Sequence, residues 1–293
     1  MSPHMHGRGC CGEENILSGR VGARGPSPSL GQRRGDDANR ERHERVAWVR
    51  RWTGVAGLFL VFDDRSSDQP FVERVWRCHS ERAGRFLSIA SSHWEMVVTR
   101  HKGKTILTVR GPETKATAID CPAEGEWLGI RFRLGTFMPR LPVANLLDRQ
   151  DVNLPGATGQ SFWLNGSAWE YPDFENAEAF VARLVKRGLI ARDRAVEDAL
   201  RGVYSALSKR SVQRHFLQAT GMTHSTFRQI ERARYATNLL KQGVSILDAV
   251  HEAGFFDQAH LTRSLKHLIG QTPAKIIGRE EQLSFLYKTT RFR

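Results

Sequence analysis

The chain has 293 residues, of which 40% are apolar, and a formal net charge of +13. This length and apolar content allow two folded domains and exclude a wholly disordered protein. Residues 191–293 carry 17 Lys and Arg against 9 Asp and Glu, residues 61–190 carry 17 against 16, and residues 1–60 carry 10 against 6. The positive excess lies mainly in the last third, as expected of a segment that binds a polyanion.

Residues 1 to about 45 are rich in Gly, Arg, Ser and Pro and show no sustained apolar period. This composition predicts that residues 1–60 are disordered or form an extension, with a basic tail that wraps DNA as the alternative. The segment lacks the apolar stretch of a secretory signal, and its acidic residues argue against an organelle transit peptide. The apolar run at residues 55–62 is too short to cross a bilayer, so we expect no membrane partner.

Residues 61–190 contain short segments with β character, separated by turn residues. The clearest segments lie at residues 85–90, 94–99, 105–109 and 127–132. In the last of them Leu128, Ile130 and Phe132 alternate with glycine and arginine, which predicts a sheet with one buried face. We expect the folded region to begin near Phe71 and to form an antiparallel sandwich or a cupin-like barrel.

A helix is predicted at residues 176–188, with Phe180 and Leu184 facing the core. His93 and Glu95 lie two apart on an expected strand and so share a face, but a metal site needs more ligands at closer spacing. We therefore expect no metal and no other cofactor. The four cysteines show no C-x-x-C spacing, which favours free thiols, with a redox sensor as the alternative.

The last third of the chain contains an internal repeat. Residues 212–223 (VQRHFLQATGMT) align with residues 261–272 (LTRSLKHLIGQT) at a constant offset of 49 residues. Three aligned pairs are identical: Arg214 with Arg263, Gly221 with Gly270, and Thr223 with Thr272. Each copy has the pattern of a short basic helix that ends at glycine.

The second copy contains the signals of two helices joined by a turn. Ser245 precedes an apolar run and Asp248 follows three residues later, which is a capping box with Asp in place of Glu. Gly254 allows a sharp turn, and Asp257 can cap a helix over residues 258–268. Helix, glycine turn and helix together predict a helix-turn-helix unit.

On the second helix of this unit, Leu261, Leu265 and Leu268 recur at helical spacing and are predicted to face the core. The side chains left for the outside are Gln258, His260, Thr262, Arg263 and Lys266. Hydrogen-bonding and cationic side chains of these types read base edges and hold phosphates.

The first copy repeats this arrangement, with Ser208 as the cap and Val212, Phe216 and Ala219 expected to pack. Its outward side chains are Lys209, Arg210, Gln213, Arg214 and Gln218.

Between the copies, residues 226–240 predict one long helix that ends before Gly243. Its expected packing stripe is Phe227, Ile230, Ala233, Arg234, Ala236, Thr237 and Leu240. Such a spacer could hold two reading helices at a fixed distance, and successive major grooves on one face of B-DNA lie roughly 34 Å apart.

This pattern resembles the AraC/XylS family of bacterial transcription regulators over about the last third of the chain. The residues that carry the resemblance are Ser208, Gln213, Arg214, Phe216, Gly221, Arg232, Ala236, Leu240, Gly254, Phe255, Asp257, Gln258, Leu261, Thr262, Arg263, Lys266, Gly270, Thr272 and Pro273. The core GF-x-DQ-x-HLTR…K…G-x-TP is highly specific. One departure is Gly202, which falls where the family has a helix interior.

The resemblance implies two sets of base-contacting residues, one on each recognition helix. The first set is Arg210, Gln213 and Arg214, and the second is Gln258, His260, Thr262 and Arg263. Four further residues are predicted to anchor phosphates: Ser208, Lys209, Arg232 and Lys266.

We therefore expect a mainly-β, sensor-like domain over residues 61–190 and an all-α domain with two helix-turn-helix units over residues 191–280, followed by a tail over residues 281–293. The expected function is sequence-specific regulation of transcription, as an activator that an effector controls through the β-domain, with no enzymatic activity. Double-stranded DNA is the expected partner, and RNA polymerase, a small-molecule effector and a second copy of the chain are candidates. The expected location is the cytoplasm, at the nucleoid when bound to DNA.

Two alternatives remain open. The first is a nonspecific architectural DNA-binding protein, against which the different side chains of the two reading helices argue. The second is an enzyme in the β-domain with a DNA-targeting module, for which the sequence offers no nucleophile–base pair, phosphate loop or metal spacing.

Overall fold

The computed structural model describes residues 59–148, 151–201 and 208–278, and all of them belong to one compact unit of the chain. The extension expected over residues 1–60 and the tail over residues 281–293 lie outside the described residues, apart from the start of the first strand. Within the described part, no helix is long and apolar enough to cross a membrane.

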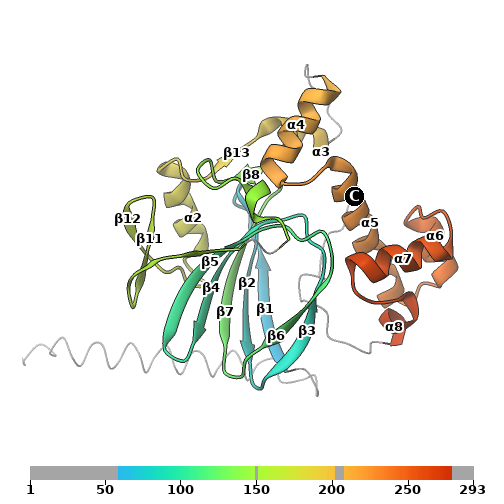
Figure 1. Ribbon diagram of the computed structural model, residues 1–293, viewed down its shortest axis with the longest axis horizontal. Helices are drawn as coiled ribbons and strands as arrows, with labels where there is room; N and C mark the ends of the chain where they lie inside the picture. The colour runs from blue at the N-terminus through green and yellow to red at the C-terminus, as the bar shows by residue number, and fades with distance from the viewer. Residues whose placement is uncertain (1–58, 149–150, 202–207, 279–293) are drawn as a thin grey trace, which may run out of the picture. The chain divides into compact units, whose positions relative to one another are not determined.

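A six-stranded antiparallel sheet forms the centre of the β-rich part (Figure 1). Its strands, in order across the sheet, are β1 (Leu60–Ser66), β2 (Val72–Ser80), β7 (Glu126–Phe132), β4 (Glu95–His101), β5 (Lys104–Arg110) and β9 (Val152–Leu154). Lys102 and Gly103 join β4 to β5 with positive φ angles of 48° and 73°, as a two-residue hairpin turn requires. The β segments predicted at residues 94–99, 105–109 and 127–132 are confirmed.

Three small sheets accompany the main one. They are β3 (Gly84–Ser88) with β6 (Thr117–Cys121), β8 (Thr136–Phe137) with β13 (Ala191–Arg192), and the meander of β10 (Gly156–Thr158), β11 (Ser161–Leu164) and β12 (Ser167–Glu170). The segment predicted at residues 85–90 is confirmed as β3, which ends two residues earlier.

The structure corrects the prediction of a cupin-like barrel. The main sheet is open, because β1 and β9 stand at its two ends and do not pair with each other. The folded region also begins before Phe71, because β1 pairs with β2 from Leu60 onward. The sequence signal of β1 is weak because Leu60 is the one fully buried residue of the strand.

The prediction of one buried face is also wrong for β7. Gly129 and Arg131 are buried together with Leu128, Ile130 and Phe132. β7 lies between β2 and β4, and an added Cβ at Gly129 would come within 2.0 Å of the Trp76 ring. Arg131 is 2% exposed and its Nε donates to Oε1 of Glu95 at 2.8 Å. Both faces of this central strand are therefore covered, one of them by a buried ion pair.

Helix α2 (Ala177–Lys186) confirms the helix predicted at residues 176–188. Its Phe180, Val181 and Leu184 are fully buried in the core of the main sheet. Cys78 and Cys121 are buried free thiols, as predicted, and burial raises the pKa of each.

The C-terminal part is helical. Its elements are α3 (Arg194–Leu200), α4 (Lys209–Thr220), α5 (His224–Lys241), α6 (Ile246–Glu252), α7 (Gln258–Leu268) and α8 (Pro273–Gly278). α5 is the long helix predicted at residues 226–240, and every residue of its predicted packing stripe is buried. α5 contacts α4 near its start and α6, α7 and α8 farther along, so the two repeated units share one helix as their support (Figure 1).

Candidate nucleic-acid interface

The second helix-turn-helix unit consists of α6, a turn at Gly254, and α7. Ser245 Oγ accepts a hydrogen bond from the Asp248 N–H at 3.1 Å and donates to Asp248 Oδ2 at 2.6 Å. Gly254 has a φ of 69°, and Asp257 Oδ1 accepts from the His260 N–H at 2.6 Å. Both predicted caps are confirmed, so local side-chain chemistry sets where α6 and α7 begin.

We expect Asp257→Ala to lower the free energy of unfolding by about 1 kcal/mol, because the first turn of α7 loses its acceptor. Asp257→Asn keeps a side-chain oxygen at the cap and should cost much less. Urea unfolding of the full chain measures both variants. Equal losses for the two substitutions would show that the cap does not stabilise α7.

The outer face of α7 presents the residues predicted to contact DNA. Gln258, Arg263 and Lys266 are exposed, and His260 and Thr262 are half-buried. Thr262 Oγ1 donates to the Gln258 carbonyl at 2.8 Å. His260 packs its ring edge-on against Phe255, with centroids 5.2 Å apart, and its Nδ1 lies 3.5 Å from the Phe256 N–H. This orientation leaves Nε2 as the ring nitrogen available to a ligand.

In the first unit, α4 follows the same plan. Ser208 Oγ accepts from the Ser211 N–H at 3.2 Å, and α4 ends at Gly221, whose φ is 74°. Phe216 and Ala219 are buried as predicted, whereas Val212 is only half-buried. The sequence departure at Gly202 falls in residues 202–207, which lie outside the described residues.

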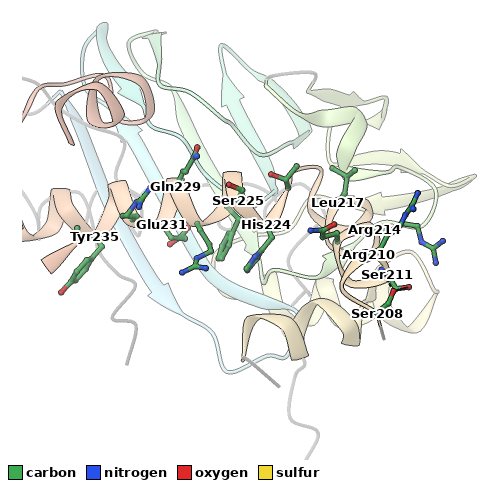
Figure 2. A pocket seen from close by; sticks show the side chains of 16 residues that line it. Ser208, Arg210, Ser211, Arg214, Leu217, His224, Ser225, Gln229, Glu231 and Tyr235 are labelled. Carbon is green, nitrogen blue, oxygen red and sulfur yellow. Dashed lines mark hydrogen bonds between the residues drawn. The ribbon is translucent and has the colours of Figure 1, made fainter. Parts of the chain in front are cut away.

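A groove of about 1440 Å³ lies between α4 and α5 (Figure 2). It is lined by Ser208, Arg210, Ser211, Gln213, Arg214, Leu217, Thr223, His224, Ser225, Phe227, Arg228, Gln229, Glu231, Arg232, Tyr235 and Ala253. All three base-contacting residues predicted on α4 are among them, together with the predicted phosphate anchors Ser208 and Arg232. Of the other two predicted anchors, Lys266 lies on α7, and the side chain of Lys209 is not among those that the structure describes.

Residues 204–279 match the family model described as a helix-turn-helix domain. The match covers α4 to α8 and therefore both repeated units. This segment is an AraC/XylS-type DNA-binding domain. The chain is accordingly a DNA-binding regulator of transcription with a mainly-β N-terminal part. No curated protein and no solved structure gave a match to the chain.

The exposed face of α5 is a part of the groove that the sequence analysis missed. His224, Arg228 and Tyr235 are exposed along this face and line the groove of the AraC-type domain. Their positions lie between those of the packing stripe, so the helical period that located the stripe also identifies this opposite face. Phe256, beside the cap of α7, was missed as well and is 90% exposed.

Arg232 contacts the second unit as well as lining the groove. Its Nη1 donates to the Gly254 carbonyl at 3.1 Å, and its guanidinium lies 4.8 Å from the centre of the Phe255 ring. The residue therefore ties α5 to the turn between α6 and α7. Its predicted contact with a phosphate remains a prediction.

A buried polar cluster lies where α5 of the AraC-type domain meets the main sheet. Ser92 Oγ donates to Glu231 Oε1 of α5 at 2.9 Å and lies 3.2 Å from Nδ1 of His93. His93 Nε2 lies 3.1 Å from Glu73 Oε2. A Ser-His-Glu order is typical of an activated nucleophile, but Ser92 is 1% exposed and its hydroxyl is bonded to α5. The arrangement here fastens α5 to the sheet.

The surroundings of this cluster account for His93 and Glu95, the pair that the sequence analysis considered as possible metal ligands. Both lie near Arg131, which bonds Glu95 and acts electrostatically on His93. Among the described residues, no group of three or more His, Cys, Asp or Glu side chains could hold a metal ion.

The cluster predicts acid sensitivity. Burial lowers the pKa of His93. Burial also opposes ionisation of Glu73, but the positive charges of His93 (once it is protonated), Arg131 and Arg234 outweigh it and lower the pKa of that carboxyl. An unfolded histidine takes up its proton near pH 6.5, where the buried His93 remains neutral. The unfolded state therefore binds more protons, and the free energy of unfolding should fall as the pH drops below about 6.5.

The ionised Glu73 has the same sign, because its stabilisation is present above the unfolded pKa and is lost as the pH falls through the folded one. We expect His93→Gln to flatten the loss of stability between pH 7 and pH 5. His251→Gln, at an exposed position of α6, is the control and should leave the slope unchanged. Urea unfolding at three pH values compares them, and an unchanged slope in His93→Gln would refute the assignment.

Proposed function

We propose that the chain is a sequence-specific transcription regulator that reads two adjacent major-groove segments, one with α4 and one with α7. The observation that carries this proposal is the repetition of one capped helix on a single support. Each copy has a buried apolar edge against the shared core and an exposed polar and cationic edge. α5 supports both helices, so their two exposed faces could enter two successive major grooves on one face of DNA.

The proposed division of roles separates residues that read bases from residues that hold phosphates. Arg210, Gln213 and Arg214 would read bases in the first segment, and Gln258, His260, Thr262 and Arg263 in the second. Arginine can pair bidentately with guanine, and glutamine with adenine. Ser208, Lys209, Arg232 and Lys266 would hold phosphates, which sets the register without specifying sequence.

The β-rich part over residues 61–190 would form the regulatory domain and residues 191–280 the DNA-binding domain. The hydrophobic core around α2 and the main sheet supports this division, because it is formed by residues 72–190 and contains none of the proposed DNA contacts. An effector bound by this part, RNA polymerase, and a second copy of the chain are the candidate partners for activation.

Selection of bound duplexes from a random pool, with the full chain, tests the proposal. The expected result is an enriched motif with two elements about one helical turn apart. A single enriched element would reduce the first unit to a backbone contact. No enrichment, together with steeply salt-dependent binding, would identify a nonspecific architectural protein instead.

A further inference from the structure

The C-terminal end of α7 is capped by two loops of the β-rich part. The Leu268 carbonyl accepts a hydrogen bond from the Ala90 N–H at 2.8 Å, and the His267 carbonyl accepts from the Ala116 N–H at 2.9 Å. The last carbonyls of a helix have no partner within the helix. Here the chain after β3 and the chain before β6 supply the missing donors, so the β-rich part holds the end of the second recognition helix.

The C-terminal end of α4 lies against a different element of the β-rich part. An added Cβ at Gly221 would lie 3.0 Å from Ala144 Cα and 3.2 Å from the Val143 carbonyl oxygen, both in the short 3-10 helix η1 (Val143–Leu146). Also on α4, His215 Nδ1 lies 2.8 Å from Oδ2 of Asp193. The backbone N–H of Asp193 in turn donates to the Gly135 carbonyl at 2.8 Å.

Four glycines of the helical part share a left-handed backbone but differ in their surroundings. Gly221 and Gly270, which the repeat aligns, have φ angles of 74° and 83°, and Gly243 and Gly254 have 88° and 69°. An added Cβ at Gly270 would lie 3.1 Å from Ala116 Cβ. An added Cβ at Gly243 or Gly254 would meet nothing within 4 Å. The two glycines that end the recognition helices are therefore the two that touch the β-rich part.

A third contact lies between these two ends. Ser92 bonds Glu231 in the middle of α5, as described above. Ile89 and Ala90 of the β-rich part belong to the same hydrophobic core as Phe216 of α4 and Leu265 of α7. The β-rich part thus contacts both recognition helices and the helix that joins them.

We propose that the β-rich part is a brace that fixes the distance and rotation between α4 and α7, and so sets the spacing of the two DNA elements that the chain accepts. This inference rests on the proposed function. One added base pair moves the second element along the duplex and rotates it by about a tenth of a turn. A braced pair of helices cannot follow this change, whereas an unbraced pair could. Ala90, Ala116, Ala144 and Ser92 act as positioning residues that do not touch DNA.

The test compares binding of the full chain to its selected site and to the same site with one base pair added between the elements. We expect the addition to weaken binding by wild-type protein by at least roughly tenfold, the scale of losing one good base contact. Gly221→Ala and Gly270→Ala force the helix ends away from the β-rich part, so the ratio of the two affinities should fall toward one. Gly243→Ala carries the same kind of backbone strain without the contact and should keep the wild-type ratio.

Three further variants keep the test decisive if a glycine variant fails to fold. Ala116→Gly combined with Gly270→Ala removes the nearest clash and should restore the wild-type ratio. Ser92→Ala breaks the central contact without altering a glycine and should lower the ratio, whereas Ser92→Thr, which retains the hydroxyl, should lower it less.

The outcomes separate the brace from the function on which it rests. If wild-type protein selects a two-element site but Gly221→Ala and Gly270→Ala keep its ratio, or Gly243→Ala changes the ratio as much as they do, the brace is refuted and the regulator remains. If wild-type protein selects no site, the proposed function fails and the brace fails with it.

Discussion

Phe216→Ala should lower the free energy of unfolding by about 3–5 kcal/mol, the usual loss when a buried phenylalanine is truncated. Phe216 is fully buried and lies 5.6 Å from the Phe227 ring and 5.2 Å from the His224 ring, measured between centroids. Both neighbours belong to α5, so the substitution removes the main apolar contact between α4 and its support. We therefore expect the first DNA element to lose its influence on binding as well.

Leu217→Ala is the matched control, because the adjacent side chain is 47% exposed and belongs to the groove rather than the core. Its effect on unfolding should stay within about 0.5 kcal/mol, as for most surface substitutions. Urea unfolding of the full chain measures both variants. A loss for Leu217→Ala as large as that for Phe216→Ala would contradict the packing described for α4.

Arg263→Ala should relax base preference at one position of the second DNA element. Arg263 is exposed on the outer face of α7, and a bidentate contact between arginine and guanine contributes about 1–3 kcal/mol of discrimination. The ratio of affinities for the preferred base and its substitutes at that position should fall by roughly 5- to 150-fold, the same range expressed as an equilibrium. Preferences elsewhere in the site should persist.

Lys266→Ala, one turn farther along the same exposed face, provides the contrast. A residue that holds a phosphate carries no sequence information, so every sequence should be weakened alike and the salt dependence should become shallower by about one unit of slope. Competition binding with single-base variants of the selected site, at several salt concentrations, measures both substitutions. A change confined to one base preference in Lys266→Ala would show that the two roles are wrongly assigned.

The helical part follows closely from the sequence, because its signals are local. A cap such as Ser245 or Asp257 needs only a neighbour three residues away, and the packing stripe of α5 needs only the helical period. The aligned glycines Gly221 and Gly270 likewise mark where each recognition helix ends. For these reasons the helix boundaries of α5, α6 and α7, the turn at Gly254 and the buried residues of α5 agree with the sequence analysis.

The β-rich part was predicted less completely, because its structure depends on residues far apart in the chain. The alternation in β7 identified a strand but not its central place in an open sheet. Arg131 was expected on the exposed side, and its burial depends on Glu95 and on the covering of the second face. The contacts of α4 and α7 with η1, Ala90 and Ala116 join segments more than seventy residues apart. No local period marks such contacts.

Interference by guanine-N7 methylation, measured with the full chain on its selected site, tests most directly whether α4 and α7 read adjacent major grooves. Methylation blocks the atom to which an arginine in the major groove donates. Reading by both helices predicts two clusters of interfering guanines, with centres about 10–10.5 base pairs apart on one face of the duplex. Arg214→Ala should abolish interference in one cluster and Arg263→Ala in the other. A single cluster, or interference that neither substitution changes, would contradict reading by two helices.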